Sequence, residues 1–213
     1  MSYALLRFVA LKILHINDIF IKEVTGLENI PNDDGAILAM NHMSYLDTVL
    51  MTLLIAEKCN RKLRNLGKTE LFRTAIGRWF HNTVGTIPIN RDATGEIALK
   101  NALDLLKKKE LIGIYPEGGR SRDGKLRQGK TGMVRLALWS KKKIIPVGIR
   151  GTYELWPHQK KIPTFKKIVT IHIGRPLRLE AYYKKPITKT LLRTLTDKVM
   201  KEIGKLANLE YPY

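Results

Sequence analysis

A histidine and an aspartate, His42 and Asp47, stand five positions apart between two segments of different character. The apolar run 36–40 before them predicts a buried strand, and the run 48–57 after them predicts a helix. Residues five apart on a regular helix are rotated by about 140°, because one turn takes about 3.6 residues. The two side chains can therefore meet only if the chain turns between them, with Asp47 near the helix start, where a carboxylate is favoured.

This pair has two interpretations. An imidazole that a carboxylate orients is a general-base arrangement. Alternatively, His42 lies on the surface and Asp47 only caps the helix, with no relation between them. The choice depends on what other parts of the chain bring to the same place.

Polar groups also follow other predicted strands. Arg91 follows a β-branched run, and the segment Glu117–Arg120 follows a buried one. Gly118 and Gly119 let backbone N–H groups approach an anion, and an arginine fork suits phosphate or carboxylate. Lys68, which opens a predicted helix, would add an ammonium group. Ligands of open α/β sheets bind beyond the carboxyl ends of the strands, so we expect these groups at one edge; the alternative is a glycine turn with a solvated arginine.

Apolar runs of strand length alternate with amphipathic helical patterns along the chain, which is typical of an α/β fold. The length of 213 residues fits one domain with a substantial core. We therefore predict a single α/β domain with a mostly parallel or mixed central sheet flanked by helices. The predicted strands are 36–40, 61–67, 84–89, 111–115, 144–149 and 168–174, and the predicted helices are 48–57, 68–81, 94–109, 130–140 and 188–206.

The segment from Tyr3 to Lys22 has the pattern of an amphipathic helix. It would either pack on the domain or lie in the headgroup region of a membrane. The predicted organisation is thus an N-terminal helix over 1–22 and an α/β domain over 23–213. No cleavable signal peptide is apparent, and no run approaches the roughly 18 uncharged apolar residues of a spanning helix.

The chain is strongly basic, with 38 Lys and Arg against 19 Asp and Glu, a net charge of +19. Such a surface attracts polyanions, which include nucleic acid, an anionic membrane and an acidic carrier protein. A non-catalytic polyanion-binding protein is therefore one alternative. The one cysteine, Cys59, cannot form an internal disulfide, which fits a reducing compartment.

Other chemistries have weaker support. Residues 124–131 match the P-loop pattern, but a P-loop needs a strand directly before its first glycine, and residues 120–123 are polar. A nucleotide hydrolase is therefore a minor alternative. The sequence holds no serine-elbow motif and no metal-ligand motif, so we expect no metal site.

Four stretches together resemble the four blocks of the PlsC-type glycerolipid acyltransferases, the 1-acylglycerol-3-phosphate acyltransferase family. The order and spacing of the blocks agree over roughly residues 24–175. Two positions depart from the family pattern: Gly119 stands where the family usually has Thr or Ser, and Tyr115 replaces the usual Phe. The four stretches are 41–47, 85–91, 115–121 and 145–147.

The resemblance implies roles for individual residues. His42 would be the general base, and Asp47 would orient it while a substrate hydroxyl attacks an acyl thioester directly, without an acyl-enzyme. Arg91 and Arg120, with Lys68, would hold the phosphate of the acceptor beside the Gly118 and Gly119 backbone. Glu117 would position the glycerol or brace the arginines.

The resemblance also implies the substrates and partners. The acceptor would be the sn-2 hydroxyl of 1-acylglycerol 3-phosphate (lysophosphatidate), giving phosphatidate; glycerol 3-phosphate or another lyso-lipid is the alternative. The donor would be acyl-CoA or an acyl carrier protein thioester, and no other cofactor is expected. The enzyme would lie at the cytoplasmic face of the membrane, peripheral or monotopic, on an anionic surface, with no nucleic-acid partner.

Overall fold

The computed structural model of the chain describes residues 15–83, 85–89 and 96–213, with the backbone alone for 68, 76, 80, 83, 89, 96 and 98. Within these ranges seven strands form one sheet in the order β1-β7-β6-β2-β5-β3-β4. All neighbours are parallel except β6 and β7, so the predicted α/β domain with a mixed sheet is confirmed. The strands are β1 (Ile21–Thr25), β2 (Ala36–Met40), β3 (Leu63–Lys68), β4 (Ile87–Ile89), β5 (Leu111–Ile114), β6 (Ile144–Arg150) and β7 (Val169–Ile173).

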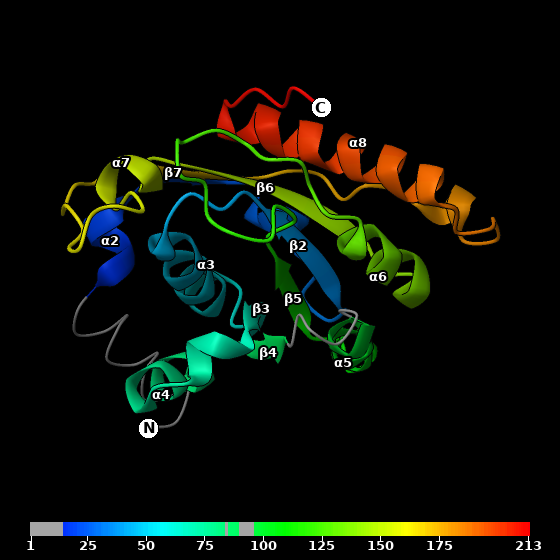
Figure 1. Cartoon of the computed structure of the whole chain (residues 1–213), viewed down its shortest axis with the longest axis horizontal. Coiled ribbons are helices and arrows are strands. Elements are labelled where there is room, and N and C mark those ends of the chain that lie inside the picture. The colour runs from blue at the N-terminus through cyan, green and yellow to red at the C-terminus, as the bar shows by residue number, and fades with distance from the viewer. Residues whose placement is uncertain (1–14, 84, 90–95) are drawn as a thin grey trace.

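Helices cover both faces of the sheet (Figure 1). Apolar side chains of α2 and α3 join one core cluster, and those of α5, α6 and α8 join the other. Two elements, η3 and α4, connect β3 to β4. The helices are α2 (Ile16–Phe20), α3 (Tyr45–Lys58), α4 (Ala75–Thr83), α5 (Glu96–Lys107), α6 (Gly132–Ser140), α7 (Thr152–Leu155) and α8 (Lys189–Ala207), with short 3-10 turns η2 (Leu27–Asn29), η3 (Thr69–Phe72) and η4 (Glu180–Tyr182).

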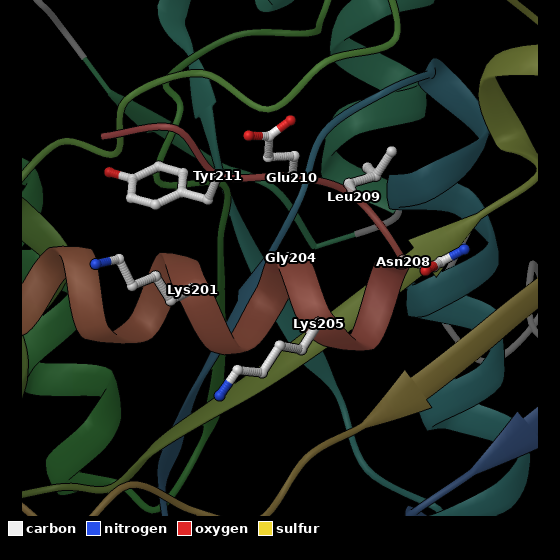
Figure 2. Close-up of a pocket in the computed structure, with 7 residues that line it drawn as sticks. All are labelled: Lys201, Gly204, Lys205, Asn208, Leu209, Glu210 and Tyr211. Atoms are coloured by element: carbon white, nitrogen blue, oxygen red, sulfur yellow. The ribbon is translucent and has the colours of Figure 1, made fainter.

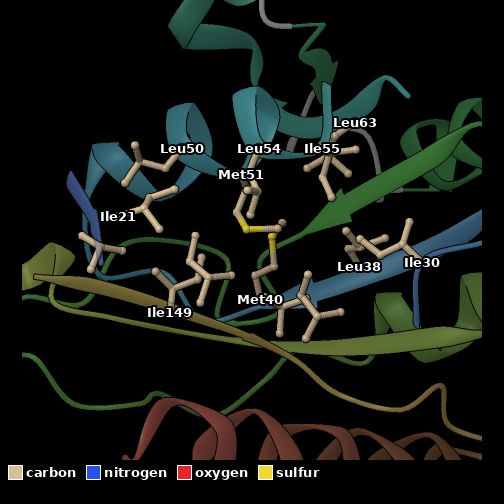
Figure 3. Close-up of a cluster of buried hydrophobic side chains, with 14 of the residues drawn as sticks. Ile21, Ile30, Leu38, Met40, Leu50, Met51, Leu54, Ile55, Leu63 and Ile149 are labelled. Carbon is tan, nitrogen blue, oxygen red and sulfur yellow. The ribbon is translucent and has the colours of Figure 1, made fainter. Parts of the chain in front are cut away.

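The central strand β2 shows why the sequence builds three layers. All five of its residues are buried, as expected for a strand that helices cover on both sides. Leu38 and Met40 belong to the cluster under α3, while Ile37 and Ala39 belong to the cluster under α5, α6 and α8. Figure 3 shows Met40 against Met51 of α3. Alternate side chains of one strand thus anchor both helical layers.

The strand directions determine where the polar segments emerge. Strands β2, β5, β3 and β4 are consecutive and parallel, and their registers pair Ala39 with Ile114 and Lys68 with Ile89. Their carboxyl ends therefore lie along one edge of the sheet. The segment after β2 carries the His42–Asp47 pair, and the segment after β5 carries Glu117.

The structure corrects the predicted N-terminal helix. Residues 3–14 of that helix lie outside the described residues. The described part is helical only over α2, and Ile21–Thr25 is strand β1, which pairs in parallel with β7. The expected boundary between 22 and 23 therefore falls inside a strand of the sheet. A strand edge that is distant in sequence satisfies the backbone of β1, and local periodicity does not reveal such a partner.

The helix predicted over 68–81 is also divided. Its first part is the end of β3 and the 3-10 turn η3, and α4 follows from Ala75. The other predicted strands and helices are present with small shifts at their ends. Among the helices of the described ranges, none combines the length and hydropathy needed to cross a bilayer.

Candidate active site

His42 and Asp47 meet across the turn between β2 and α3. Nδ1 of His42 lies 2.9 Å from Oδ2 of Asp47. The Asp47 side chain is fully buried, whereas 16% of the His42 side chain is exposed. The imidazole therefore lies between a buried carboxylate and the surface. Of the two interpretations that the sequence left open, the structure favours the one in which these residues are in contact.

Asp47 also holds the turn that carries His42. Its Oδ2 accepts the backbone N–H groups of Met43 and Ser44, each at 2.7 Å, and Ser44 caps α3 in a capping box with Asp47. Among the described residues, the buried Oδ1 has no hydrogen-bond partner. With Asp47 ionised, Nδ1 carries the proton and Nε2 is left as the acceptor.

Tyr115 fixes the plane of the imidazole. Its ring stacks on His42, with centroids 4.0 Å apart and an interplanar angle of 23°. The hydroxyl of Thr48 donates to the Tyr115 hydroxyl at 3.1 Å. Burial, and then the charge of Asp47, raise the pKa of Tyr115 above its ordinary value, so the phenol stays neutral. The residue that replaces the usual family Phe is thus a direct neighbour of His42.

The side chain of Glu117 holds the His42 turn through a hydrogen bond to its backbone. Its Oε1 accepts the His42 backbone N–H at 2.8 Å, and its Oε2 accepts the Arg127 N–H at 2.9 Å. The residue is 2% exposed, and burial raises its pKa to about 7. The Ser121 N–H donates to the His42 carbonyl at 2.7 Å. Both backbone polar groups of His42 are therefore held by the segment that follows β5, and Glu117 faces protein backbone.

The glycine pair lies beside two cations, Lys130 and Arg127, that the sequence analysis did not assign to this site. Gly118 has a φ of +72°, and a Cβ there would lie 2.9 Å from Cε and 3.1 Å from Nζ of Lys130. A Cβ on Gly119 would lie 3.7 Å from a guanidinium nitrogen of Arg127. Because glycine has no side chain, both cations approach this backbone closely.

The stretch 124–131 does not have the surroundings of a P-loop. The nearest preceding strand, β5, ends at Ile114, and irregular backbone leads from there to Gly124. Lys130 was weighed in the sequence only as part of this motif. Its position beside Gly118 becomes apparent only in the folded structure. The loop returns to the end of β5, where the Lys130 N–H donates to the Pro116 carbonyl at 2.8 Å.

The other cations that the sequence predicts for this site are Arg120, Lys68 and Arg91. The guanidinium carbon of Arg120 lies 3.4 Å from the ring centre of Tyr45, the exposed first residue of α3. Lys68 is the last residue of β3, at the edge where β2 and β5 also end, and only its backbone is described. Arg91 lies outside the described residues.

A pocket of about 450 Å³ lies elsewhere, at the end of α8. Figure 2 shows its lining, with Lys201 and Lys205 on the helix and Tyr211 on the segment that follows. None of its lining residues belongs to the strand-end segments that carry His42 and Glu117. This pocket is therefore separate from the candidate active site.

Comparison with known proteins gives the class of protein. Residues 22–150 match the family model described as Acyltransferase. The chain therefore belongs to the acyltransferase family, as the four sequence blocks predict. In the described structure the blocks 41–47 and 115–121 follow β2 and β5, and the block 145–147 lies in β6. Of the block 85–91, residues 85–89 are described and include β4.

Individual proteins to which the chain is similar include several 1-acyl-sn-glycerol-3-phosphate acyltransferases. The chain is 33% identical over 137 residues to the 1-acyl-sn-glycerol-3-phosphate acyltransferase LPAT1 of Arabidopsis thaliana chloroplasts, a match that covers 63% of this chain and 37% of that protein. It is 28% identical to the Bacillus subtilis enzyme of the same name over 187 residues, covering 87% of this chain and 88% of that enzyme. The crystal structure of PlsC, a 1-acyl-sn-glycerophosphate acyltransferase from Thermotoga maritima, superposes with a TM-score of 0.69 and 25% identity, covering 96% of this chain and 79% of that one.

The extent of these matches differs. The chain spans less than two fifths of the length of the chloroplast enzymes of Arabidopsis thaliana and Brassica napus, at 37% and 39%. It spans most of the Bacillus subtilis enzyme.

Proposed function

We propose that the protein transfers a fatty acyl group from an acyl thioester to the sn-2 hydroxyl of 1-acylglycerol 3-phosphate, forming phosphatidate. The observation that carries this proposal is the contact between His42 and the buried Asp47 at the carboxyl edge of the sheet. The names of the relatives, which are 1-acyl-sn-glycerol-3-phosphate acyltransferases, support the acceptor.

The reaction would begin at Nε2 of His42. This nitrogen takes the proton of the acceptor hydroxyl while the oxygen attacks the thioester carbonyl. The tetrahedral intermediate then expels the thiolate, which takes the proton from the imidazolium, so that ester and thiol are the products. Asp47 stabilises the imidazolium between these steps. A positioned general base contributes about 100- to 10,000-fold.

Direct transfer, without an acyl-enzyme, fits the neighbouring hydroxyl and thiol groups. The Ser44 hydroxyl donates to the Trp156 carbonyl at 2.9 Å, and the Ser121 hydroxyl donates to Asp123 at 3.1 Å. Cys59 stands at the opposite end of α3, where burial raises the pKa of its thiol above the ordinary value. The substrate hydroxyl is therefore the nucleophile in this mechanism.

The acceptor phosphate would bind beside the glycine pair. The sequence assigns Arg91, Arg120 and Lys68 to this site, and the positions of Arg127 and Lys130 next to that backbone add two candidates. Charge-assisted hydrogen bonds to phosphate are stronger than neutral ones, and arginine can make two at once.

Glu117 would act differently from the sequence prediction. Because both carboxylate oxygens accept backbone N–H groups, it would position the His42 turn and would not contact glycerol. It is therefore a positioning residue in this proposal.

The donor and the location complete the proposal. The thioester would come from acyl-CoA or an acyl carrier protein, with no further cofactor. The net charge of +19 supports work at the anionic cytoplasmic face of a membrane, with the protein peripheral or monotopic.

A substrate panel tests the function. The full chain is assayed with acyl-CoA and acyl carrier protein donors against lysophosphatidate, glycerol 3-phosphate and another lyso-lipid. Preferred transfer to lysophosphatidate, lost in His42→Ala and kept in the control His172→Gln, is the expected result. Preference for glycerol 3-phosphate would overturn the assigned acceptor. Absence of transfer in every combination would overturn the enzyme, and salt-dependent nucleic-acid binding that ignores His42 would favour the polyanion-binding alternative.

A further inference from the structure

The segment from Trp156 to Ile168, here the 156–168 loop, connects α7 to β7 and presents apolar side chains at the surface. Ile162 is 69% exposed and Phe165 is 67% exposed, and Ile168 is exposed too. The same segment contains Lys160, Lys161, Lys166 and Lys167, and its sequence includes no Asp or Glu. Exposed apolar side chains that are grouped in one loop and flanked by cations indicate a surface that binds a partner.

Internal contacts hold this loop in shape. The Trp156 indole N–H donates to the Lys160 carbonyl at 2.9 Å, and the Thr164 N–H donates to the Leu155 carbonyl at 2.8 Å. The Phe165 ring stacks on Phe20 of α2, with centroids 5.6 Å apart. The exposed apolar groups are therefore presented by an organised surface.

Helix α2 extends this surface. Figure 1 shows α2 and the loop after α7 on the same side of the molecule, opposite the start of α8. Ile19 of α2 is 38% exposed. Asp18, Glu23 and Glu57 line a depression with Lys167, so acidic groups border the surface at this place.

The loop begins at the candidate active site. Its first residue, Trp156, accepts the Ser44 hydroxyl through its carbonyl and lies 5.5 Å from the Tyr45 ring. Arg120 covers the same tyrosine. Ser44 and Tyr45 belong to the turn and helix start between His42 and Asp47. The first residue of the loop therefore lies next to the turn that carries His42.

We propose that the 156–168 loop, together with Ile19, is the surface by which the protein docks on an anionic lipid bilayer. Ile162 and Phe165 would enter the boundary between headgroups and acyl chains, and the four lysines would lie at the level of the lipid phosphates. This proposal rests on the proposed function, since a lipid acceptor gives the site a reason to face a bilayer.

The charge of the loop favours lipid over a second copy of this chain. Lysine is depleted in protein–protein interfaces, and two copies of this surface would bring their lysines together. Nucleic acid would attract the lysines but offers little to exposed isoleucine and phenylalanine side chains. A surface that combines both kinds of group suits an anionic membrane.

Vesicle co-sedimentation of the full chain tests the docking surface. The apolar variant is Ile162→Ser with Phe165→Ser, and the charge variant changes Lys160, Lys161, Lys166 and Lys167 to Gln. The matched control is Ile187→Ser with Lys184→Gln and Lys185→Gln, because Ile187 is 42% exposed and precedes α8 at the far end of the molecule. Mixed phosphatidylcholine–phosphatidylglycerol vesicles are compared with pure phosphatidylcholine vesicles.

The expected results follow from the two kinds of group. The apolar variant should bind mixed vesicles about ten-fold or more weakly, since a buried large apolar side chain contributes at least that much. The charge variant should lose the preference for mixed vesicles, and the control should bind like the unchanged protein. Equal vesicle binding by the unchanged protein, both variants and the control would overturn the proposal. It would also be overturned if the unchanged protein is a dimer, the apolar variant is a monomer, and both still bind vesicles.

A second assay separates this proposal from the proposed function. A short-chain lysophosphatidate that stays monomeric in vesicle-free solution is supplied with the acyl donor. Both docking variants should transfer to it at the unchanged rate, because neither alters a group assigned to the active site. If acyl transfer occurs but the variants bind vesicles as well as the unchanged protein, the docking surface is wrong and the proposed function stands. If the variants lose vesicle binding but no protein transfers an acyl group, the proposed function is wrong and the docking surface stands.

Discussion

The carboxylate of Glu117 accepts the backbone N–H of His42 at 2.8 Å, so the segment after β5 holds the candidate base in place. The second oxygen of Glu117 accepts the Arg127 N–H at 2.9 Å. One buried side chain therefore links the turn after β2, the turn after β5 and the loop that carries Lys130. The candidate catalytic and anion-binding groups depend on each other through this link.

Replacing Glu117 should affect stability and rate together. Glu117→Ala leaves two backbone N–H groups without their acceptor, each costing about 1–3 kcal/mol if it stays dry. Glu117→Gln keeps one acceptor but sets an NH₂ group against the other N–H. We expect both variants to lower kcat, because the His42 turn moves, and to raise the KM for the acceptor, because the same carboxylate holds the loop that carries Arg127 and Lys130. Denaturant unfolding and steady-state kinetics measure the two effects, and an unchanged kcat in a folded variant would contradict the role.

The raised pKa of Glu117 predicts a dependence of stability on pH. Its pKa is raised from 4.5 to about 7, mainly by burial, so between these values the folded state holds a proton that the unfolded state has released. The contribution is fully present below about pH 4.5 and is lost as pH rises through about 7, on the order of 3 kcal/mol. Chemical denaturation between these pH values measures it. Glu117→Gln, which does not titrate, should flatten this part of the profile, and an identical slope in both proteins would contradict the prediction.

Asp47→Asn should remove most of the activity while leaving the fold. Because His42, Met43 and Ser44 all donate to the same oxygen, the amide oxygen can keep these bonds but loses the negative charge that stabilises the imidazolium. If the NH₂ group instead faces Nδ1, the imidazole proton moves to Nε2 and the acceptor that the hydroxyl needs is lost. We expect kcat to fall about 100- to 10,000-fold. Circular dichroism checks the fold, and His42→Ala should lower kcat to a similar level. If Asp47→Asn stayed within ten-fold of the unchanged enzyme, Asp47 would only cap α3.

Tyr115 separates the effect of stacking from that of a hydroxyl. Tyr115→Phe keeps the ring on His42 and loses the bond from Thr48, so we expect kcat within about three-fold. Tyr115→Leu removes the aromatic pair, which is worth about 0.5–1.5 kcal/mol, so we expect a further loss of about two- to ten-fold. Single-turnover rates at one pH compare them. A Phe variant as slow as the Leu variant would show that the hydroxyl matters more than the stacking.

Lys130 should affect binding of the acceptor and not of the donor. Lys130→Gln removes the ammonium group beside Gly118, so we expect the KM for lysophosphatidate to rise about ten-fold, the size of a lost charged hydrogen bond. Lys125→Gln, in the same loop and also exposed, is the matched control. Kinetics at constant salt distinguish them. Equal rises in both variants would point to general surface charge.

Much of the architecture follows from local pattern. Apolar runs such as 36–40 and 111–115 predict strands that are buried on both faces. The helical periodicity around 188–206 predicts α8, because burial of one helix face imposes that period. Strand β1 was missed because its partner, β7, is far along the chain. The division of 68–81 into η3 and α4 was also beyond reach, since the packing that ends a helix early is not written in its own periodicity.

The sequence by itself determined that His42, Asp47 and Glu117 follow buried strands and that the first two could meet only across a turn. It also determined the excess of positive charge and the apolar, lysine-flanked composition of 156–168. Only the tertiary structure decided that Glu117 accepts the backbone N–H of His42 and that Lys130 lies beside Gly118. It also decided that the 156–168 loop begins next to the turn that carries the candidate base. These contacts join loops from different strands, and their geometry depends on how the sheet and its helices pack, whereas periodicity reports only on neighbours along the chain.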